Sequence, residues 1–465
     1  MNLVLGVDLA CRAAHQASLA RADGTFVWTG RRFFTTTQDL ERIWSAIELT
    51  DGVTLTVVME PTRNAWAPVA AWFRRRGARI VMVPTTQSAD LRAYYSKHTK
   101  NDQLDSKLLA RLPLLHPDGL CEQTGDGPAD PLRRAVKVRS SVVKRRTAVF
   151  ARLDAMLELL GPAWYEVLGS RYGVASLALL ARYADPNALL RLGSARLARF
   201  LGRYSRGQWG DTHAQQLLAA ARQSLELWGP DGIDFAELSA DIAVEAEQAR
   251  VLSGQIDDLD ERIATLYEQV DPKGIVASAP GVGPVLSAAI AGRIGDPHRF
   301  TSLAAIRAYS GLVPKTSQSG LSSNQSGLTK AGDALLRESL FDAADNARKV
   351  DPRLAAKYAR LRAADKHHNS ALCHIATDLL TRIAACWRSD TPYQITDLDG
   401  TPLTEEQGRR IVAEHHRVTP KKSPTGAPAR RSKQLKGRAG REQQKSPGAP
   451  ASRPATTTVE PVTAA

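Results

Sequence analysis

Hydrophobic residues recur in short, strand-like runs over the N-terminal part of the chain, and two stretches between them have helical spacing instead. Three apolar runs separated by glycine or polar turns predict an opening meander, and two further runs alternate with helices. Strands are expected at 3–9, 15–21, 25–35, 55–61 and 79–84, and helices at 38–50 and 64–76. This order matches a ribonuclease H-like α/β sheet with one face packed by helices.

Strand signals nearly vanish from about residue 131, where long stretches of helical spacing begin. The stretches 132–160 and 234–270 are the longest, and the second has the apolar spacing and flanking charge of a coiled-coil helix. Pairing within one protomer and pairing between two would satisfy it equally well. Residues 274–390 predict a further helical domain with a Gly- and Ser-rich interruption.

The length of 465 residues exceeds what a single hydrophobic core supports, so we expect several domains. The fold class is α/β plus all-α. The expected parts are an acidic α/β domain at 1–115, a helical, coiled-coil-like region at 131–272, a helical C-terminal domain at 273–395 and a disordered basic tail at 417–465.

Charge and cysteine content narrow the class of protein. The net charge is +14, and the tail at 417–465 carries eleven Lys or Arg against two Glu, which leaves +9 there. A polyanionic partner is expected for the tail and is consistent with the body. The four cysteines, Cys11, Cys121, Cys373 and Cys386, have no C-x-x-C spacing, which argues against zinc modules and disulfides and fits a reducing cytoplasm. Neither a signal peptide nor a membrane span is expected.

Four carboxylates lie at the ends of apolar runs or at a helix start, where an unpaired charge is costly unless it faces a cleft or a cation. Asp8 ends the apolar run GVDLA, and Glu60 ends VVMEP. Asp102 and Asp105 lie three apart at a helix start in KNDQLDSKLLA, on one helical face. If all four converge, divalent cations must neutralise them, and carboxylate oxygens favour Mg²⁺ or Mn²⁺. Each acid alone is better explained as a helix cap or a strand-end charge, whereas the set of four favours metal-assisted phosphodiester chemistry.

The C-terminal half offers hydroxyl groups beside basic residues. Small and hydroxylated residues fill a predicted flexible loop at 316–329, and Lys330, Gly332, Asp333 and Arg337 follow on a predicted amphipathic helix. Lys330 and Arg337 could neutralise phosphate oxygens, or could simply form the wet face of that helix. Upstream, the turn PGVGP at 280–284 could hold a phosphate as a helix-hairpin-helix turn, or could pack two helices.

A dense basic run, RRAVKVRSSVVKRR at 133–146, falls on one predicted helix. Such a helix could grip the phosphates of DNA or of a folded RNA, and the alternative is a solvated helix face. The basic residues are Arg133, Arg134, Lys137, Arg139, Lys144, Arg145 and Arg146. The histidine- and cysteine-containing stretch HHNSALCH at 367–374 is better explained as a packed or solvated helix than as a metal site.

The acidic order D…E…D-x-x-D, carried by GVDLA, VMEPT and NDQLD, resembles that of DEDD transposases, the bridge-RNA-guided recombinases of insertion sequences. The similarity covers about residues 1–110 and again about 274–390. It implies a RuvC-like N-terminal domain that uses Asp8, Glu60, Asp102 and Asp105. It also implies a C-terminal serine domain, in which the serine of a Ser-Gly pair after a Gly-x-x-Pro segment attacks DNA. That serine is Ser319 here, with Ser317, Ser322 and Ser323 as alternatives.

The resemblance also implies the partners, which are donor and target DNA, a noncoding bridge RNA, and copies of the chain that form a dimer and then a tetramer, in the nucleoid of a bacterial cytoplasm. Composition alone does not distinguish RNA from DNA. Two alternatives to a transposase remain. One is a RuvC-like nuclease or junction resolvase in which the acids activate water, and the other is a non-catalytic nucleic-acid-binding scaffold.

Overall fold

The computed structural model describes most of the chain up to residue 416. The described residues are 2–50, 52–85, 87–88, 90, 102–115, 120–123, 127, 129–169, 172–230, 232–319 and 322–416. The basic tail expected at 417–465 lies outside them.

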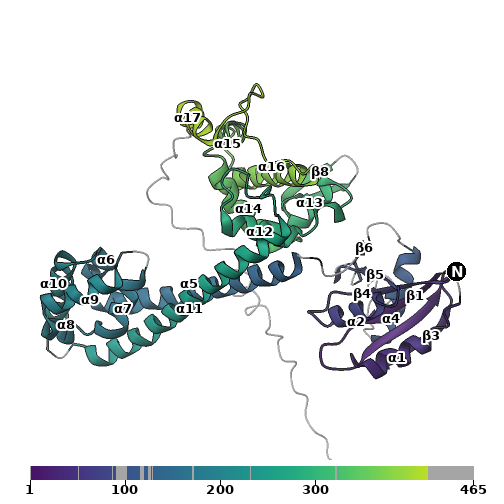
Figure 1. Cartoon of the computed structure of the whole chain (residues 1–465), viewed down its shortest axis with the longest axis horizontal. Helices are drawn as coiled ribbons and strands as arrows, with labels where there is room; N and C mark the ends of the chain where they lie inside the picture. The colour runs from purple at the N-terminus through teal and green to yellow at the C-terminus, as the bar shows by residue number, and fades with distance from the viewer. Residues whose placement is uncertain are drawn as a thin grey trace, which may run out of the picture. The chain divides into compact units, whose positions relative to one another are not determined.

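The N-terminal part forms a six-stranded mixed sheet with the strand order β3-β2-β1-β4-β5-β6 (Figure 1). Strand β1 pairs with β2 antiparallel and with β4 parallel, and β4 pairs with β5 parallel. The strands are β1 (Asn2–Asp8), β2 (His15–Arg21), β3 (Phe26–Phe33), β4 (Thr54–Met59), β5 (Arg79–Met82) and β6 (Cys121–Glu122). The five strands predicted from the apolar runs are therefore confirmed. The sheet continues past residue 115 because the short β6 adds to its edge.

Helices cover both faces of this sheet, so the expectation of one covered face was wrong. Helices α1 (Thr37–Ser45) and α2 (Trp66–Arg74) pack on one face in a core that includes Leu5. Helix α4 (Asp102–Leu115) packs on the other face, where Val4 joins a core with Leu109 and Leu112. Because Val4 and Leu5 are adjacent in one strand, β1 buries apolar side chains on both sides.

Gly6 sets how closely α4 approaches β1. A Cβ added at Gly6 would lie 2.2 Å from the carbonyl oxygen of Ser106 and 2.3 Å from the amide nitrogen of Ala110. The neighbouring Ser18, which is paired with Gly6 across the sheet, hydrogen bonds through Oγ to the Ser106 Oγ at 2.8 Å. Helix α4 therefore lies directly on the backbone of β1 at this level.

Two long antiparallel helices, α5 (Ala129–Leu160) and α11 (Phe235–Val270), form the middle of the chain (Figure 1). Arg139 pairs with Asp260 and Arg152 with Glu245, so rising numbers on α5 meet falling numbers on α11. The predicted coiled-coil-like helix therefore packs within its own protomer. Five shorter helices fill the connection around a shared apolar core: α6 (Pro162–Leu168), α7 (Val174–Tyr183), α8 (Pro186–Leu192), α9 (Ser194–Tyr204) and α10 (Asp211–Trp228).

The C-terminal part is mostly helical and contains one β-hairpin. Its elements are α12 (Pro284–Ile294), the 3₁₀ helix η1 (Pro297–Arg299), α13 (Leu303–Ser310), β7 (Pro314–Ser319), β8 (Ser322–Leu328), α14 (Ala334–Ala347), α15 (Pro352–Ala363), α16 (His368–Arg388) and α17 (Glu405–His415). The turn before α12 serves packing, because a Cβ on Gly281 would lie 2.5 Å from the amide nitrogen of Ala347.

Two expectations about the serine-containing segment were wrong. Residues 316–329 do not form a loop, because β7 and β8 pair antiparallel over most of this range. Their polar residues lack the apolar alternation by which a half-buried strand is found from sequence. Lys330 does not lie on a helix: it has a φ of 53°, and Asp333 caps α14, which begins at Ala334.

None of the helices that the structure describes has the length and apolar character needed to span a membrane.

Candidate active site and nucleic-acid interface

Two of the predicted acidic residues lie side by side at one edge of the N-terminal sheet. Asp8 is the last residue of β1, and Glu60 directly follows β4. The two strands are parallel neighbours in which Val7 pairs with Met59, so the next residue of each strand reaches the same edge. Both carboxylates are half-buried. The sheet register thus supports the prediction that two strands present a carboxylate at one place.

Helix α4 runs opposite to β1, which brings its first turn to the same edge. Ser106 contacts Gly6 near the end of β1. One turn further on, the Arg111 guanidinium lies 4.7 Å from the centre of the Phe26 ring, and Phe26 is level with Val4 near the start of β1. The amino-terminal end of α4 is therefore at the carboxyl end of β1.

Asp105 lies in this first part of α4 and is buried, with 6% of its surface exposed. The side chain of Asp102 lies outside the described residues. Among the side chains that are described, no group of three or more His, Cys, Asp or Glu is close enough to hold a metal ion. Asp8, Glu60 and Asp105 are nonetheless all carboxylates, and carboxylate oxygens are the ligands that Mg²⁺ and Mn²⁺ prefer.

Sequence reasoning missed His15, which holds the segment that follows Asp8. The His15 ring is buried, with 3% exposed, and its Nδ1 accepts the Ala10 backbone N–H at 3.1 Å. Its Nε2 hydrogen bonds with the Thr35 Oγ1 at 2.7 Å. Burial lowers the pKa of His15, which favours the neutral ring that this acceptor role requires. A single histidine at the start of a strand gives no sequence signal for this contact.

The candidate serines lie on the β7–β8 hairpin. In its backbone register Ser319 pairs with Ser322, Gln318 with Ser323, and Ser317 with Asn324. The side chains of residues 316–326 lie outside the described part of the structure, so the choice among these serines stays a prediction.

The two basic residues predicted beside the hairpin differ in their surroundings. Arg337, on α14, donates from Nη1 to the carbonyl oxygen of Ser310 at 3.1 Å and so ties α14 to the end of α13. Lys330 is exposed. The charge of Lys330 is thus more accessible to solvent than that of Arg337, which is half-buried.

The seven basic residues of α5 divide into two groups. Three contact neighbouring elements. Arg133 donates to the Gly292 carbonyl at 3.1 Å, Arg139 forms a two-pronged ion pair with Asp260, and Arg146 reaches Ser253. The other four, Arg134, Lys137, Lys144 and Arg145, are exposed. Within this second group, Lys144 also forms an exposed ion pair with Glu338 on α14.

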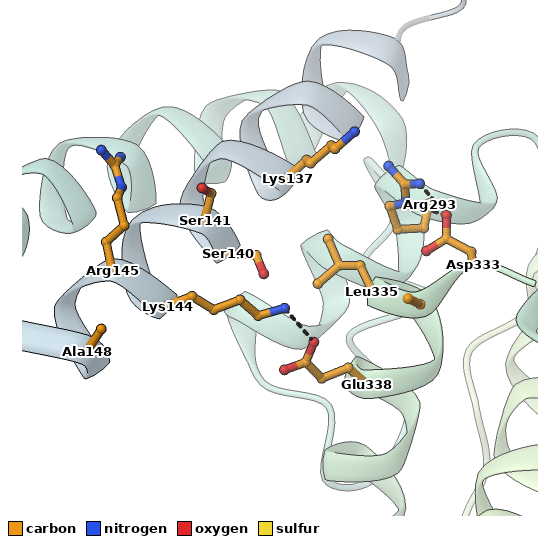
Figure 2. Close-up of a pocket in the computed structure, with 11 residues that line it drawn as sticks. Lys137, Ser140, Ser141, Lys144, Arg145, Ala148, Arg293, Asp333, Leu335 and Glu338 are labelled. Atoms are coloured by element: carbon orange, nitrogen blue, oxygen red, sulfur yellow. Dashed lines mark hydrogen bonds and ion pairs between the residues drawn. The ribbon is translucent and has the colours of Figure 1, made fainter. Parts of the chain in front are cut away.

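A cavity of about 710 Å³ lies between α5 and the helices α12 and α14 (Figure 2). On its α14 side the Glu338 Oε2 accepts from the Lys144 Nζ at 3.4 Å. Its lining includes Lys137, Ser140, Ser141, Lys144 and Arg145 from α5, and Arg293, Asp333, Leu335 and Glu338 from the other side.

The stretch 367–374 forms the start of α16, as expected, and His368 hydrogen bonds through Nδ1 to the Tyr358 hydroxyl at 2.8 Å. Cys11, Cys373 and Cys386 form no disulfide in the described part of the chain.

Comparison with known proteins assigns a family to this arrangement. Residues 5–162 match the transposase model DEDD_Tnp_IS110, and residues 273–359 match the Transposase IS116/IS110/IS902 family. The chain belongs to the IS110/IS116/IS902 family of transposases. The matched ranges include both the acidic edge and the serine hairpin. The resemblance to DEDD transposases is thereby confirmed, and the protein is a DNA transposase that cuts and rejoins DNA to move an insertion sequence.

Proteins of several insertion elements are similar to this transposase over most of their length. It is 24% identical over 404 residues to the IS110 uncharacterized 43.6 kDa protein of Streptomyces coelicolor. The matched region covers 85% of this chain and 96% of the relative. It is 28% identical over 360 residues to the IS900 uncharacterized 42 kDa protein of Mycobacterium paratuberculosis, covering 76% and 88%. It is 26% identical over 317 residues to the IS116 uncharacterized 44.8 kDa protein of Streptomyces clavuligerus, covering 68% and 77%.

Proposed function

We propose that this transposase breaks and rejoins DNA strands with a divalent-metal site at the edge of the N-terminal sheet and with Ser319 as its nucleophile. The observation that carries the proposal is the parallel pairing of β1 with β4, which sets Asp8 beside Glu60, while α4 brings Asp105 to the same edge. Asp102, at the start of α4, would complete the set of ligands. Mg²⁺ or Mn²⁺ bound there would neutralise these acids and polarise a phosphoryl oxygen.

The acids and the serines have complementary roles. A serine hydroxyl is a poor nucleophile at neutral pH, so it needs a strongly stabilised transition state or a polarised phosphate. The acidic edge lacks a nucleophile of its own among the predicted residues, and the hairpin lacks a carboxylate cluster. We therefore propose that the two regions serve one reaction, with Lys330 neutralising charge on the phosphate oxygens.

The reaction is balanced without an external energy source. As the serine Oγ forms a bond to phosphorus, one ester bond of the DNA strand breaks and the leaving deoxyribose hydroxyl takes up the proton. A hydroxyl from another strand then attacks the phosphoserine, restores a phosphodiester and releases the serine. The covalent link conserves the energy of the original bond. This agrees with the lack of a Walker-type G-x-x-x-x-G-K-[ST] motif in the sequence.

The partners are part of the same proposal. We infer that a structured noncoding bridge RNA selects donor and target DNA by base pairing, while the protein contacts helical backbone and shape. We also infer a dimer that assembles into a tetramer. The support for both is the likeness to DEDD transposases, and the exposed basic residues of α5 are compatible with a nucleic-acid partner.

Trapping the covalent intermediate tests this function. A nicked DNA substrate that prevents rejoining is incubated with the protein, resolved by denaturing electrophoresis, and the adduct is mapped by peptide mass spectrometry. We expect the adduct on Ser319 and its loss in Ser319→Ala, with Ser317→Ala, Ser322→Ala and Ser323→Ala as matched controls. An adduct on another of these serines would correct the residue and keep the mechanism. Efficient cleavage by a protein that lacks all four would support the hydrolytic nuclease instead.

A further inference from the structure

The cavity between α5 and α14 contains a set of side chains for which strand cleavage gives no role (Figure 2). Its α5 wall carries the cations of Lys137, Lys144 and Arg145, all exposed, and the hydroxyls of Ser140 and Ser141. Ammonium, guanidinium and hydroxyl groups are all hydrogen-bond donors to phosphate oxygens.

We propose that this cavity binds the phosphodiester backbone of a nucleic-acid strand, and that Glu338 occupies the place of one phosphate until the strand arrives. The proposal extends the contacts of the transposase beyond its cutting site. It does not depend on which serine is the nucleophile or on a metal ion at the acidic edge.

The charge of the lining favours an anion. Four cations, Lys137, Lys144, Arg145 and Arg293, face two carboxylates, Asp333 and Glu338, so the lining keeps a net charge of +2. Arg293 and Asp333 satisfy each other, with the Arg293 Nε donating to the Asp333 Oδ2 at 2.7 Å and little of either side chain exposed. The excess charge therefore resides on α5.

The spacing of these cations suits a polymer better than a single small anion. Lys137 and Lys144 lie seven residues apart on α5. On an α-helix this is a rise of about 10 Å, the distance covered by about three phosphates of one strand in a duplex. Ser140 and Ser141 lie between the two lysines and would contact the same stretch of backbone.

Glu338 is held only weakly, so a phosphate can compete with its carboxylate for Lys144. Its only described ion pair is to Lys144, at 3.4 Å, and the two side chains are 54% and 67% exposed. Exposed pairs of this kind contribute little, so a phosphate can replace the carboxylate at small cost. Arg139, on the same helix, differs from Lys144 because Asp260 fixes its guanidinium in a two-pronged ion pair.

Salt-dependent binding tests the proposal with the full chain. Fluorescence anisotropy measures the affinity for a duplex DNA, a single-stranded DNA and a hairpin RNA across a range of salt concentrations. We expect the triple variant Lys137→Gln/Lys144→Gln/Arg145→Gln to bind more weakly. Its slope of log affinity against log salt should fall by roughly 0.9 for each duplex phosphate that the variant no longer neutralises, and by about 0.7 for a single strand. The polymer with the changed slope identifies DNA or RNA as the source of the backbone.

The matched control removes three exposed arginines from α9 by the triple change Arg196→Gln/Arg199→Gln/Arg203→Gln, which alters net charge equally. Its slope should stay at the wild-type value for the polymer that the cavity binds. An equal fall in both triple variants, or an unchanged slope in the cavity variant for all three polymers, overturns the proposal.

Glu338→Gln gives a test in the opposite direction. Removal of the competing carboxylate should tighten binding about two- to fivefold, the equilibrium factor expected for an exposed ion pair. In a Lys144→Gln background the same change should have no such effect, because the cation for which the carboxylate competes is absent. Equal tightening in both backgrounds would indicate a general charge effect and contradict the displacement of Glu338 by phosphate.

Discussion

Gly6→Ala should inactivate the transposase although it changes no charged group. The added methyl group would stand 2.2 Å from the Ser106 carbonyl oxygen and 2.3 Å from the Ala110 amide nitrogen, whereas ordinary contacts begin at 3.4 Å. Both obstructing atoms belong to the main chain of α4. No rotamer change can relieve the overlap, so the helix must move away from β1 by roughly 1 Å.

The shift has two expected consequences. Overpacking of this kind costs about 1–3 kcal/mol of folding free energy. Helix α4 also carries Asp105, and a displacement of about 1 Å in an active site can cost roughly 100-fold in rate. We therefore expect strand cleavage to fall by about two orders of magnitude even under conditions in which the variant is fully folded.

Urea unfolding followed by tryptophan fluorescence measures the first effect, and cleavage of donor DNA at saturating protein measures the second. Gly127→Ala is the matched control, because an added Cβ there meets nothing within 4 Å. Wild-type stability and wild-type cleavage in Gly6→Ala would refute the packing argument. Lower stability with normal cleavage by the folded fraction would show that the position of α4 does not govern the acidic site.

Three further predictions concern other parts of the chain. The lowered pKa of His15 means that its contribution to stability is complete above about pH 6.5 and is lost as the pH falls, because the unfolded chain then takes up a proton that the fold resists. In His15→Gln the pH dependence of the unfolding free energy between pH 7 and 5 should be shallower, by at most about 1.4 kcal/mol per pH unit. Arg139→Gln should lower the unfolding free energy by roughly 1 kcal/mol and leave the salt dependence of nucleic-acid binding unchanged, because Asp260 already holds its guanidinium; a shallower salt slope would place Arg139 on a nucleic acid after all. Deletion of 417–465 should weaken nucleic-acid binding and make its salt slope shallower while cleavage persists, and an unchanged slope would show that the tail does not touch the polyanion.

The sheet could be predicted from sequence because β1, β4 and β5 are continuous apolar runs with clear turn signals. The same logic placed Asp8 and Glu60 at the ends of their strands, and parallel pairing then made them neighbours. The β7–β8 hairpin was missed because its residues are polar. Strand β6 was missed because two residues are too few to show an alternation of apolar and polar positions.

The contacts that position the site could not be predicted from the spacing of residues in the sequence. Nothing in the sequence distinguishes Gly6 from a glycine in a loose strand until α4 is seen on its backbone. Likewise, helical spacing predicted that the basic residues of α5 share a helix but could not show which of them α11 and α12 engage. Arg133 and Arg139 proved to contact protein, while Lys137 and Lys144 line the cavity.

Mg²⁺-dependent DNA cleavage by the double variant Asp8→Ala/Glu60→Ala tests the acidic site most directly. The matched control is Asp23→Ala/Glu48→Ala, which removes two acids that line a cavity beside Asn2, at the opposite end of β1. We expect the first variant to keep its fold by circular dichroism, to bind Mn²⁺ more weakly by calorimetry and to lose cleavage by at least about 100-fold, while the control cleaves normally. Unchanged Mg²⁺-dependent cleavage by a folded Asp8→Ala/Glu60→Ala protein would contradict the metal-site account.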